Sequence, residues 1–296
     1  MFGIFKQFTP GKNKSSDNMK PHNSLDSSDD DLTVVKSNSQ TNFRSTSCQS
    51  TGRIRTHNED TLFTFYSLLD GVDSPLSLGI FMIADGMGGH QSGEVASRLA
   101  VKGASQYLID KIYGDYFYKG KSFSDRNLKQ LLKESVEEAQ AMIQQQVPGG
   151  GTTLTFVLAL GDRLFSAHVG DSRLYLLDLA GKMKIRTKDH TLVKRLIDLG
   201  EISEKEATSH PNKNVLYRAL GQEEPFEPDI DQFAMKKGER LLLCSDGLWG
   251  VVDEKQMLDI INNSANMDEM VCKLVDAAND AGGPDNISVV MVEKLT

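Results

Sequence analysis

An apolar run that stops abruptly at an aspartate constrains this sequence most. Residues 80–84 (Ile-Phe-Met-Ile-Ala) are followed by Asp85, and then by Gly86, Gly88 and Gly89. An apolar run of this length bounded by glycine predicts a buried strand, which places the Asp85 carboxylate at a strand end, facing a cleft. The glycines leave the backbone free to turn sharply and to approach a ligand closely. The segment fits a metal or phosphate site, but an Asp-Gly pair taken alone more often just closes a hairpin.

The composition indicates a globular chain and disfavours several classes of function. The 296 residues suffice for one large domain or two small ones, with 39% hydrophobic and 25% charged residues. A net charge of −8 argues against broad nucleic-acid binding. Three widely spaced cysteines form neither a disulfide framework nor a zinc site. They favour a reducing compartment, and we expect a cytoplasmic protein without a transmembrane segment or signal peptide.

The N-terminal part differs in composition from the rest of the chain. Residues 1–45 are rich in Ser, Asp, Asn and Lys, which predicts a disordered or weakly ordered tail. Order is expected to begin near Cys48, so that residues 46–296 form one domain. Within that domain the polar, helix-patterned segment 188–224 interrupts a block of strands and is interpreted as an insert.

Hydrophobic periodicity, together with Gly, Pro and helix-capping residues, predicts the main elements of the domain. Apolar residues recur at helical spacing in two segments before Pro148 and in two segments near the C-terminus. The predicted helices are 92–112, a helix from Ser124 that ends before Pro148, 254–262 and 267–281; the predicted strands are 62–66, 80–84, 153–160, 164–169, 174–177, 241–244 and 287–292.

Acidic residues gather at strand boundaries in five separate places. They are Glu59-Asp60, Asp85, Asp171, Asp246 and Asp285. Burying several carboxylates together is unfavourable unless cations neutralise them. Oxygen ligands without His or Cys favour the hard cations Mg²⁺ or Mn²⁺. Two such ions can acidify a water molecule and deliver it in line to phosphorus, and Arg55 is a candidate for the phosphate clamp.

Six short motifs, in order, resemble those of the metal-dependent serine/threonine protein phosphatases of the type 2C family. The match covers residues 47–295, and the Asp-Gly-Met-Gly-Gly-His form is similar to the bacterial branch. The motifs are Arg55-Thr-His-Asn58-Glu59-Asp60, Asp85-Gly86-Met87-Gly88-Gly89, Gly151-Thr152-Thr153, Gly170-Asp171-Ser172-Arg173, Ser245-Asp246-Gly247 and Gly283-Pro284-Asp285-Asn286.

The resemblance implies a fold and a reaction. The fold is α+β: two packed antiparallel β-sheets flanked on both sides by antiparallel helix pairs. The reaction is removal of phosphate from phosphoserine and phosphothreonine of proteins by a metal-activated water. The expected partners are phosphoproteins made by a cognate serine/threonine kinase, and the expected state is a monomer. The insert at 188–224 resembles a flap that influences substrate choice.

The resemblance also implies residue roles. Arg55 binds the substrate phosphate and, with Asp85 and Asp246, is catalytic. Asp85 bridges two metals, and the carbonyl of Gly86 lies on the second. The remaining ligands are Asp246 and Asp285 on the first metal, Glu59 and Asp60 directly or through water, and Asp171 with Asp246 at a third, weaker site.

One position departs from the family pattern. Animal members carry a His directly after the Asp-Gly pair, as the proton donor to the leaving group, whereas this chain has Met87. His90 is close in sequence. The identity of the general acid stays open at this stage.

Several alternatives compete with these interpretations. Asp171 could instead cap its own turn, with Arg173 as its partner. Segment 114–122 is a poor phosphate-binding loop because it has aromatic bulk and five residues between its glycines. Asp229-Ile-Asp231 is a poor aspartyl-phosphate motif. Trp249 is interpreted as core packing. The alternative function from another class is a non-catalytic, metal-bound regulator that binds phosphoproteins.

Overall fold

The structure is a computed structural model that describes residues 42–69, 76–88, 91–115, 119–120, 122–222 and 227–296. Most of the predicted N-terminal tail therefore lies outside the described residues, as does His90. The first strand begins at Phe43, which is earlier than the predicted onset of order near Cys48.

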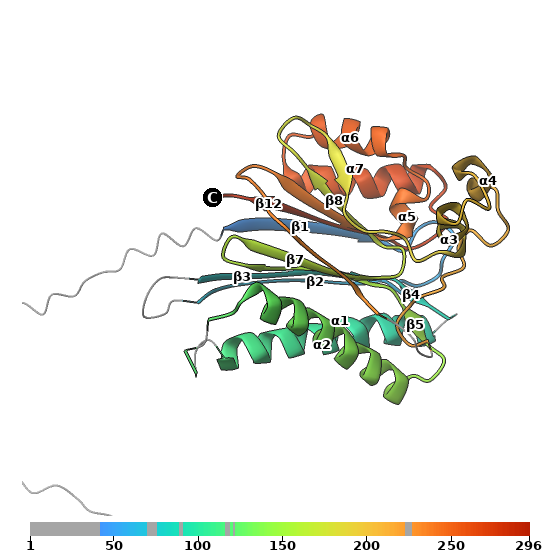
Figure 1. Ribbon diagram of the computed structural model, residues 1–296. Coiled ribbons are helices and arrows are strands. Elements are labelled where there is room, and N and C mark those ends of the chain that lie inside the picture. The colour runs from blue at the N-terminus through green and yellow to red at the C-terminus, as the bar shows by residue number, and fades with distance from the viewer. Residues whose placement is uncertain (1–41, 70–75, 89–90, 116–118, 121, 223–226) are drawn as a thin grey trace, which may run out of the picture. The chain divides into compact units, whose positions relative to one another are not determined.

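Two five-stranded antiparallel sheets form the centre of the described chain (Figure 1). Sheet A has the spatial order β1 (Phe43–Ser50), β12 (Ile287–Lys294), β11 (Arg240–Cys244), β8 (Arg173–Leu177) and β9 (Met183–Ile185). Sheet B has the order β10 (Asp229–Phe233), β7 (Arg163–Val169), β6 (Leu154–Leu160), β3 (Leu76–Ala84) and β2 (Thr61–Leu69). Two short strands, β4 (Gly86–Met87) and β5 (Gly151–Thr152), pair separately.

Helices cover the outer face of each sheet, so the predicted α+β sandwich is confirmed. Figure 1 shows α1 (Gln91–Tyr113) and α2 (Asp125–Gln146) along sheet B, and α6 (Glu254–Asn262) and α7 (Met267–Asp280) along sheet A. Ser124 caps α2 as predicted, because its hydroxyl accepts from the backbone N–H of Asn127. The insert contributes α3 (Leu192–Asp198) and α4 (Glu204–Thr208), and α5 (Asp246–Trp249) follows β11.

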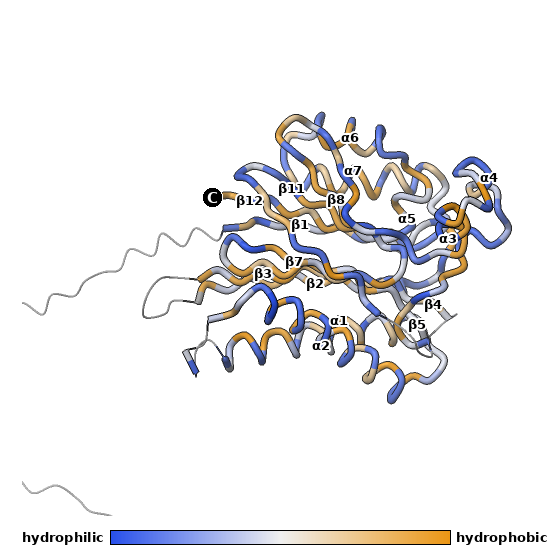
Figure 2. Tube along the Cα trace, viewed as in Figure 1, coloured by the Kyte–Doolittle hydropathy of each residue, from blue (hydrophilic) through white to orange (hydrophobic). Residues whose placement is uncertain are grey.

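The central strand β3 explains the apolar run of the sequence. Ile80 and Met82 pack toward α1 and α2, whereas Phe81 and Ile83 pack into the layer between the two sheets. Successive side chains of a strand point to opposite faces, so a strand covered on both faces must be apolar throughout. Figure 2 shows the corresponding hydrophobic colouring along the strands of sheet B.

Two elements differ from the predictions. Asp85-Gly86 does not close a hairpin, because Gly86 enters β4 and pairs with Thr152 of β5. The polar segment around Asp229 and Asp231 forms the edge strand β10, which is not among the strands predicted from the sequence. An edge strand has one exposed side and can carry charged residues, so its hydrophobic pattern is weak.

Among the described helices, none is both long enough and apolar enough to span a bilayer.

Candidate metal centre

The strand register brings the predicted acidic residues to one end of the two sheets. Thr61 is opposite Ala84, so the residues that flank this pair, Asp60 and Asp85, emerge side by side. Ser50 is opposite Ile287 in sheet A, and Cys244 is opposite Val289. The segments that contain Asp285 and Asp246 therefore leave the sheets beside the loop that follows β1.

Most of the predicted site residues line one cleft, which has a volume of about 200 Å³. Residues from seven separate segments of the chain line it, and Arg55 is the only cation among them. The lining residues are Arg55, Glu59, Asp85, Gly86, Met87, Gly88, Thr153, Asp171, Asn214, Leu216, Asp246 and Asp285. Of the predicted ligands, only Asp60 is missing from this lining.

The backbone around Asp85 is held by the neighbouring β5–β6 connection. Its N–H donates to Thr153 Oγ1 at 2.8 Å, and its carbonyl accepts from Thr153 N at 2.9 Å and Thr152 Oγ1 at 2.9 Å. These bonds satisfy the backbone of Asp85 at the strand end. The carboxylate is thereby left to face the cleft.

Asp60 lies behind the cleft rather than in its wall. Its Oδ2 accepts hydrogen bonds from Ser245 Oγ at 2.9 Å and from Ser288 Oγ at 2.7 Å, while its Oδ1 has no partner. Burial raises the pKa of Asp60 to about 7, because the neighbouring carboxylates add to the effect and the two serine hydroxyls oppose it only in part. No local sequence pattern indicated this contact of Asp60 with either serine.

The carboxylates in and behind the cleft repel one another, and this repulsion adds to the effect of burial in raising their pKa values. Burial, followed by the charges of Asp60, Asp246 and Asp171, raises the pKa of Asp85 well above its usual range. Burial and the charge of Asp285 raise the pKa of Asp246 to about 6, and Oδ1 of Asp246 has no hydrogen-bond partner. Burial and Asp246 also raise the pKa of Asp171 well above its usual range. Such a group of buried acids lacks positive charge.

The donor set fits hard cations, although the side chains do not yet converge on one. Within the ranges that the structure describes, no three Asp, Glu, His or Cys side chains are gathered closely enough to hold one metal ion. Two acids are turned to other partners: Asp285 Oδ2 lies 2.8 Å from Arg55 Nη2, and Glu59 Oε1 lies 3.1 Å from His57 Nε2. Uncompensated carboxylates repel, so this spread is expected. Oxygen donors with unpaired atoms suit Mg²⁺ or Mn²⁺.

Gly86 is required because three segments meet at its Cα. A Cβ at this position would lie 2.3 Å from Gly93 O and 2.6 Å from Glu59 O. The glycine therefore lets the turn after β3, the start of α1 and the loop before β2 pack against one another. Gly86 is buried and also contributes to the lining of the cleft.

Asn286 joins the two loops that carry Glu59 and Asp285. Its Oδ1 accepts from Glu59 N at 2.8 Å, and its Nδ2 donates to Thr51 O at 2.9 Å and to His57 O at 3.0 Å. The motif contained Asn286, but nothing local in the sequence indicated partners about 230 residues away.

Arg173 forms its ion pair with Asp189 rather than with Asp171, although its charge still opposes the rise in the pKa of Asp171. Arg173 binds Asp189 with two hydrogen bonds of 3.0 and 2.7 Å. The Arg173 guanidinium lies 3.6 Å from the ring centroid of Trp249, and the Trp249 indole donates to Asp171 O at 3.0 Å. Trp249 also packs against the core under α6 and α7, as predicted.

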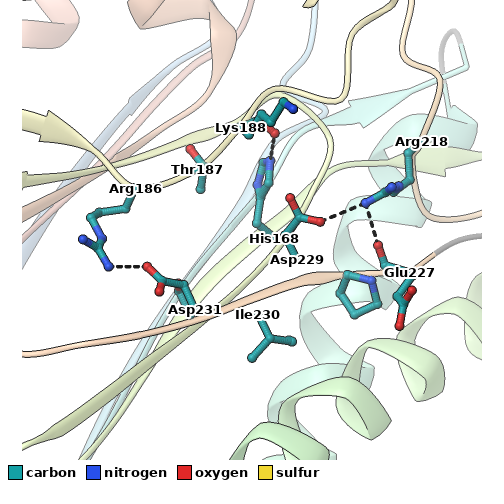
Figure 3. A pocket seen from close by; sticks show the side chains of 11 residues that line it. His168, Arg186, Thr187, Lys188, Arg218, Glu227, Asp229, Ile230 and Asp231 are labelled. Carbon is teal, nitrogen blue, oxygen red and sulfur yellow. Dashed lines mark hydrogen bonds and ion pairs between the residues drawn. The ribbon is translucent and has the colours of Figure 1, made fainter. Parts of the chain in front are cut away.

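A second, larger cavity lies at the edge of sheet B, away from the acidic cleft. It has a volume of about 490 Å³ and is lined by His168, Arg186, Lys188, Arg218 and the β10 acids, among others. Figure 3 shows that Arg186 pairs with Asp231 and that Arg218 pairs with Asp229. These charges neutralise one another, so this cavity lacks the uncompensated charge of the metal cleft.

Comparisons with known proteins agree with this geometry. The model of the family described as protein phosphatase 2C matches residues 44–291. The chain is 37% identical over 243 residues to the serine/threonine phosphatase stp of Listeria innocua, covering 82% of this chain and 92% of the relative. It is 36% identical over 242 residues to the serine/threonine protein phosphatase PstP of Mycobacterium tuberculosis, covering 82% of this chain and 43% of the relative.

Solved structures show the same fold. A crystal structure of the Mycobacterium tuberculosis phosphatase PstP/Ppp matches with a TM-score of 0.70 and 33% identity, over 86% of this chain and 99% of that one. The catalytic domain of PstP in complex with 2 manganese ions matches with a TM-score of 0.68 and 32% identity, over 86% and 99%. The chain therefore belongs to the protein phosphatase 2C family and is a metal-dependent serine/threonine protein phosphatase.

Proposed function

We propose that the acidic cleft holds two Mg²⁺ or Mn²⁺ ions and hydrolyses phosphoserine and phosphothreonine esters in proteins. The single observation that carries this proposal is the lining of the cleft. Five carboxylates from five separate segments face one arginine, and a buried carboxylate oxygen, Oδ1 of Asp246, has no partner.

The ligand roles follow from position and from the family resemblance. Asp85, the carbonyl of Gly86, Asp246 and Asp285 would hold the two ions. Of the other acids, Glu59 lines the cleft, and Asp60 lies behind it with its carboxylate bound to two serine hydroxyls. Asp171 with Asp246 would hold a third, more weakly bound ion.

Divalent cations at these ligands supply neutralising charge and lower the pKa of a water nucleophile. The protein orients the ester for attack. Arg55 is half exposed at the mouth, where its guanidinium can turn from Asp285 to two phosphate oxygens. Attack forms a new P–O bond from water and breaks the bond to the seryl or threonyl oxygen.

The leaving oxygen takes its proton from water in the cleft. Apart from Arg55, the described lining holds no nitrogen acid: it contains no His or Lys, and Met87 occupies the position of the donor found in animal members. A leaving group of low pKa needs less protonation. Aryl phosphates should therefore react faster than alkyl phosphates at the same site.

The proposed substrates are phosphoproteins produced by a serine/threonine kinase, acted on by a monomer in the cytoplasm. The three cysteines support the reducing location, since the structure leaves Cys48, Cys244 and Cys272 free. Recognition rests mainly on phosphate, so phosphotyrosine can also react. Phosphoproteomics of a strain carrying Asp246→Asn would identify the substrates, and unchanged phosphosites would contradict the proposed cellular role.

The defining experiment compares wild type with Asp246→Asn on a phosphothreonine peptide and on p-nitrophenyl phosphate. Activity in wild type should require Mn²⁺ or Mg²⁺, disappear with chelator, and fall by about a thousandfold or more in the variant. Asp259→Asn is the matched control, because Asp259 is exposed on α6. A wild type that binds Mn²⁺ by calorimetry but hydrolyses neither compound would support the non-catalytic phosphoprotein-binding regulator instead.

A further inference from the structure

A second groove adjoins the metal cleft. It has a volume of about 460 Å³ and lies between the insert helices α3 and α4 and the short helix α5. Asn214 and Asp246 line both this groove and the metal cleft. Figure 1 shows α3 and α4 beside α5, at the strand ends where β4 and β5 also lie.

The wall of this groove on the insert side is apolar and incompletely covered. Val193 and Ile197 are one helical turn apart on α3 and both line the groove, together with Ala207 of α4. Neither Val193 nor Ile197 belongs to any of the three hydrophobic clusters of the described chain. Helix α3 buries none of its residues completely. Its apolar face therefore remains available to a ligand.

Trp249 forms the opposite wall and is held rigidly. Its indole donates to Asp171 O at 3.0 Å, and the Arg173 guanidinium covers its ring at 3.6 Å. Arg173 is itself fixed by two hydrogen bonds to Asp189. A large aromatic surface that loses little freedom on binding is a good platform for an aliphatic side chain.

The charges around the groove do not favour one sign of ligand. Arg173 and Asp189 neutralise each other at the wall. The other charged lining residues are two lysines and two acids: Lys194, Lys213, Glu204 and Asp246. The charges alone therefore select neither an anionic nor a cationic side chain, which leaves the apolar wall as the basis for selection.

We propose that this groove is a substrate subsite that binds an aliphatic side chain of the phosphoprotein, close in sequence to the phosphorylated residue. The proposal rests on the phosphatase function of the adjoining cleft. Because the two hollows share Asn214 and Asp246, a polypeptide anchored by its phosphate in the cleft has the groove directly beside it. Consecutive residues of an extended chain advance about 3.4 Å, so a nearby residue reaches the groove.

A peptide series tests the subsite directly. Phosphothreonine peptides in a glycine–serine background carry one leucine, moved through the three positions on each side of the phosphothreonine. We expect one or two neighbouring positions to raise kcat/KM by about tenfold over the glycine peptide, as partial burial of an aliphatic side chain predicts. Equal rates for all positions would overturn the proposal.

Variants then assign the preference to the groove. In Ile197→Ser and Val193→Ser, the ratio of kcat/KM for the leucine peptide to kcat/KM for the glycine peptide should fall toward one. Ile197→Leu should keep the wild-type ratio. Leu199→Ser is the matched control, because Leu199 lies at the end of the same helix but is 63% exposed and does not line the groove. Each ratio is internal to one variant, so a partial loss of folded enzyme does not affect it. A ratio unchanged in both serine variants would contradict the assignment.

The intrinsic fluorescence offers an independent readout, because Trp249 is the only tryptophan of the chain. A phosphonate analogue of the preferred leucine peptide should shift the emission of the manganese-loaded enzyme, and the glycine analogue should shift it much less. Calorimetry on the same samples establishes saturation. A saturated leucine analogue that leaves the emission unchanged would place the side chain elsewhere.

These outcomes separate the subsite from the proposed function. Loss of the function appears as no manganese-dependent hydrolysis of any phosphopeptide or of p-nitrophenyl phosphate. Loss of the subsite alone appears as normal hydrolysis without a leucine preference.

Discussion

Arg55 Nη2 lies 2.8 Å from Asp285 Oδ2 across the mouth of the acidic cleft. The two residues carry different proposed roles, one for the phosphate and one for a metal ion. Each neutralises the other in the described structure. Binding of cation and phosphate therefore requires this ion pair to exchange partners, and the arginine and aspartate can be tested separately.

Replacing Arg55 by Ala should weaken phosphate binding without weakening metal binding. We expect KM for a phosphothreonine peptide to rise by about tenfold or more, since a charge-assisted bidentate contact is lost. The Mn²⁺ affinity, measured by calorimetry, should stay the same or increase because Asp285 is released. Arg53→Ala is the control, since Arg53 is exposed and does not line the cleft. Parallel losses of Mn²⁺ affinity and activity in Arg55→Ala would argue against separate roles.

Replacing Asp85 by Asn should have opposite effects on stability with and without metal. The raised pKa of Asp85 means that its ionised form is disfavoured in the folded chain, so above the unfolded pKa of about 4 the charge destabilises the metal-free protein. In chelator near pH 8 the variant should melt at a higher temperature than wild type.

With saturating Mn²⁺ wild type should melt at the higher temperature. At a Mn²⁺ concentration of one hundred times Kd, the unfolding free energy of wild type rises by about 2.7 kcal/mol, and that of the variant rises less. Differential scanning fluorimetry measures both conditions. Asp110→Asn, which changes an exposed residue of α1, should behave like wild type in both. A variant that melts below wild type in chelator would show that the carboxylate is not destabilising there.

Adding a methyl group at Gly86 should disrupt the site from its backbone. The new Cβ would lie 2.3 Å from Gly93 O. Because this neighbour is a backbone atom, no side-chain rotation can relieve the clash, and the two segments must move apart. Gly86→Ala should lose about 2 kcal/mol or more of unfolding free energy and most of its Mn²⁺ affinity. At Gly114 a Cβ meets nothing within 4 Å, so Gly114→Ala is the control in urea unfolding and calorimetry. Normal Mn²⁺ binding by Gly86→Ala would contradict the close packing.

His168 should make the protein less stable in mild acid. Its Nε2 donates to the Lys188 carbonyl at 3.0 Å, and its Nδ1 lies 2.8 Å from Thr155 Oγ1. Burial, followed by the charge of His190, lowers the pKa of His168 from 6.5 to about 3. The unfolded chain therefore binds a proton that the folded chain excludes, and stability that is complete above pH 6.5 is lost as the pH falls toward 3.

The loss for this one proton is at most about 1.4 kcal/mol per pH unit. Urea unfolding of wild type and His168→Gln near pH 7.5 and near pH 5 should show a smaller pH dependence in the variant. His210→Gln, a change in the insert outside the core, should keep the wild-type dependence. Equal slopes for wild type and His168→Gln would show that His168 titrates normally in the fold.

Local sequence patterns were enough to predict the main elements. The apolar run before Asp85 predicted a buried strand, and β3 is one. Helices α2 (Asp125–Gln146) and α6 (Glu254–Asn262) begin and end within a few residues of their predicted bounds. Hydrophobic period and capping residues act over a few neighbouring positions, so the sequence displays them directly.

Local sequence patterns did not indicate the contacts that cross the fold. Arg173 is adjacent to Asp171 in its turn but binds Asp189. Asp60 lies behind the cleft, where its carboxylate accepts hydrogen bonds from Ser245 and Ser288, two residues far along the chain. Edge strand β10 carries acids that pair with arginines on other segments. No local pattern reports such partners, because they meet only after the strands have paired.

The sequence by itself determined the chemistry available to this protein: acids gathered at strand boundaries, Arg55 in the first motif, and a buried apolar strand that ends at Asp85. Only the tertiary structure decided which acids share a cleft, which one stands behind it, and which helix leaves an apolar face open beside Trp249. The reason is physical. Residue type fixes charge and hydrophobicity, whereas distance, burial and partners depend on strand register and layer packing between segments as far apart in sequence as Phe43 and Lys294.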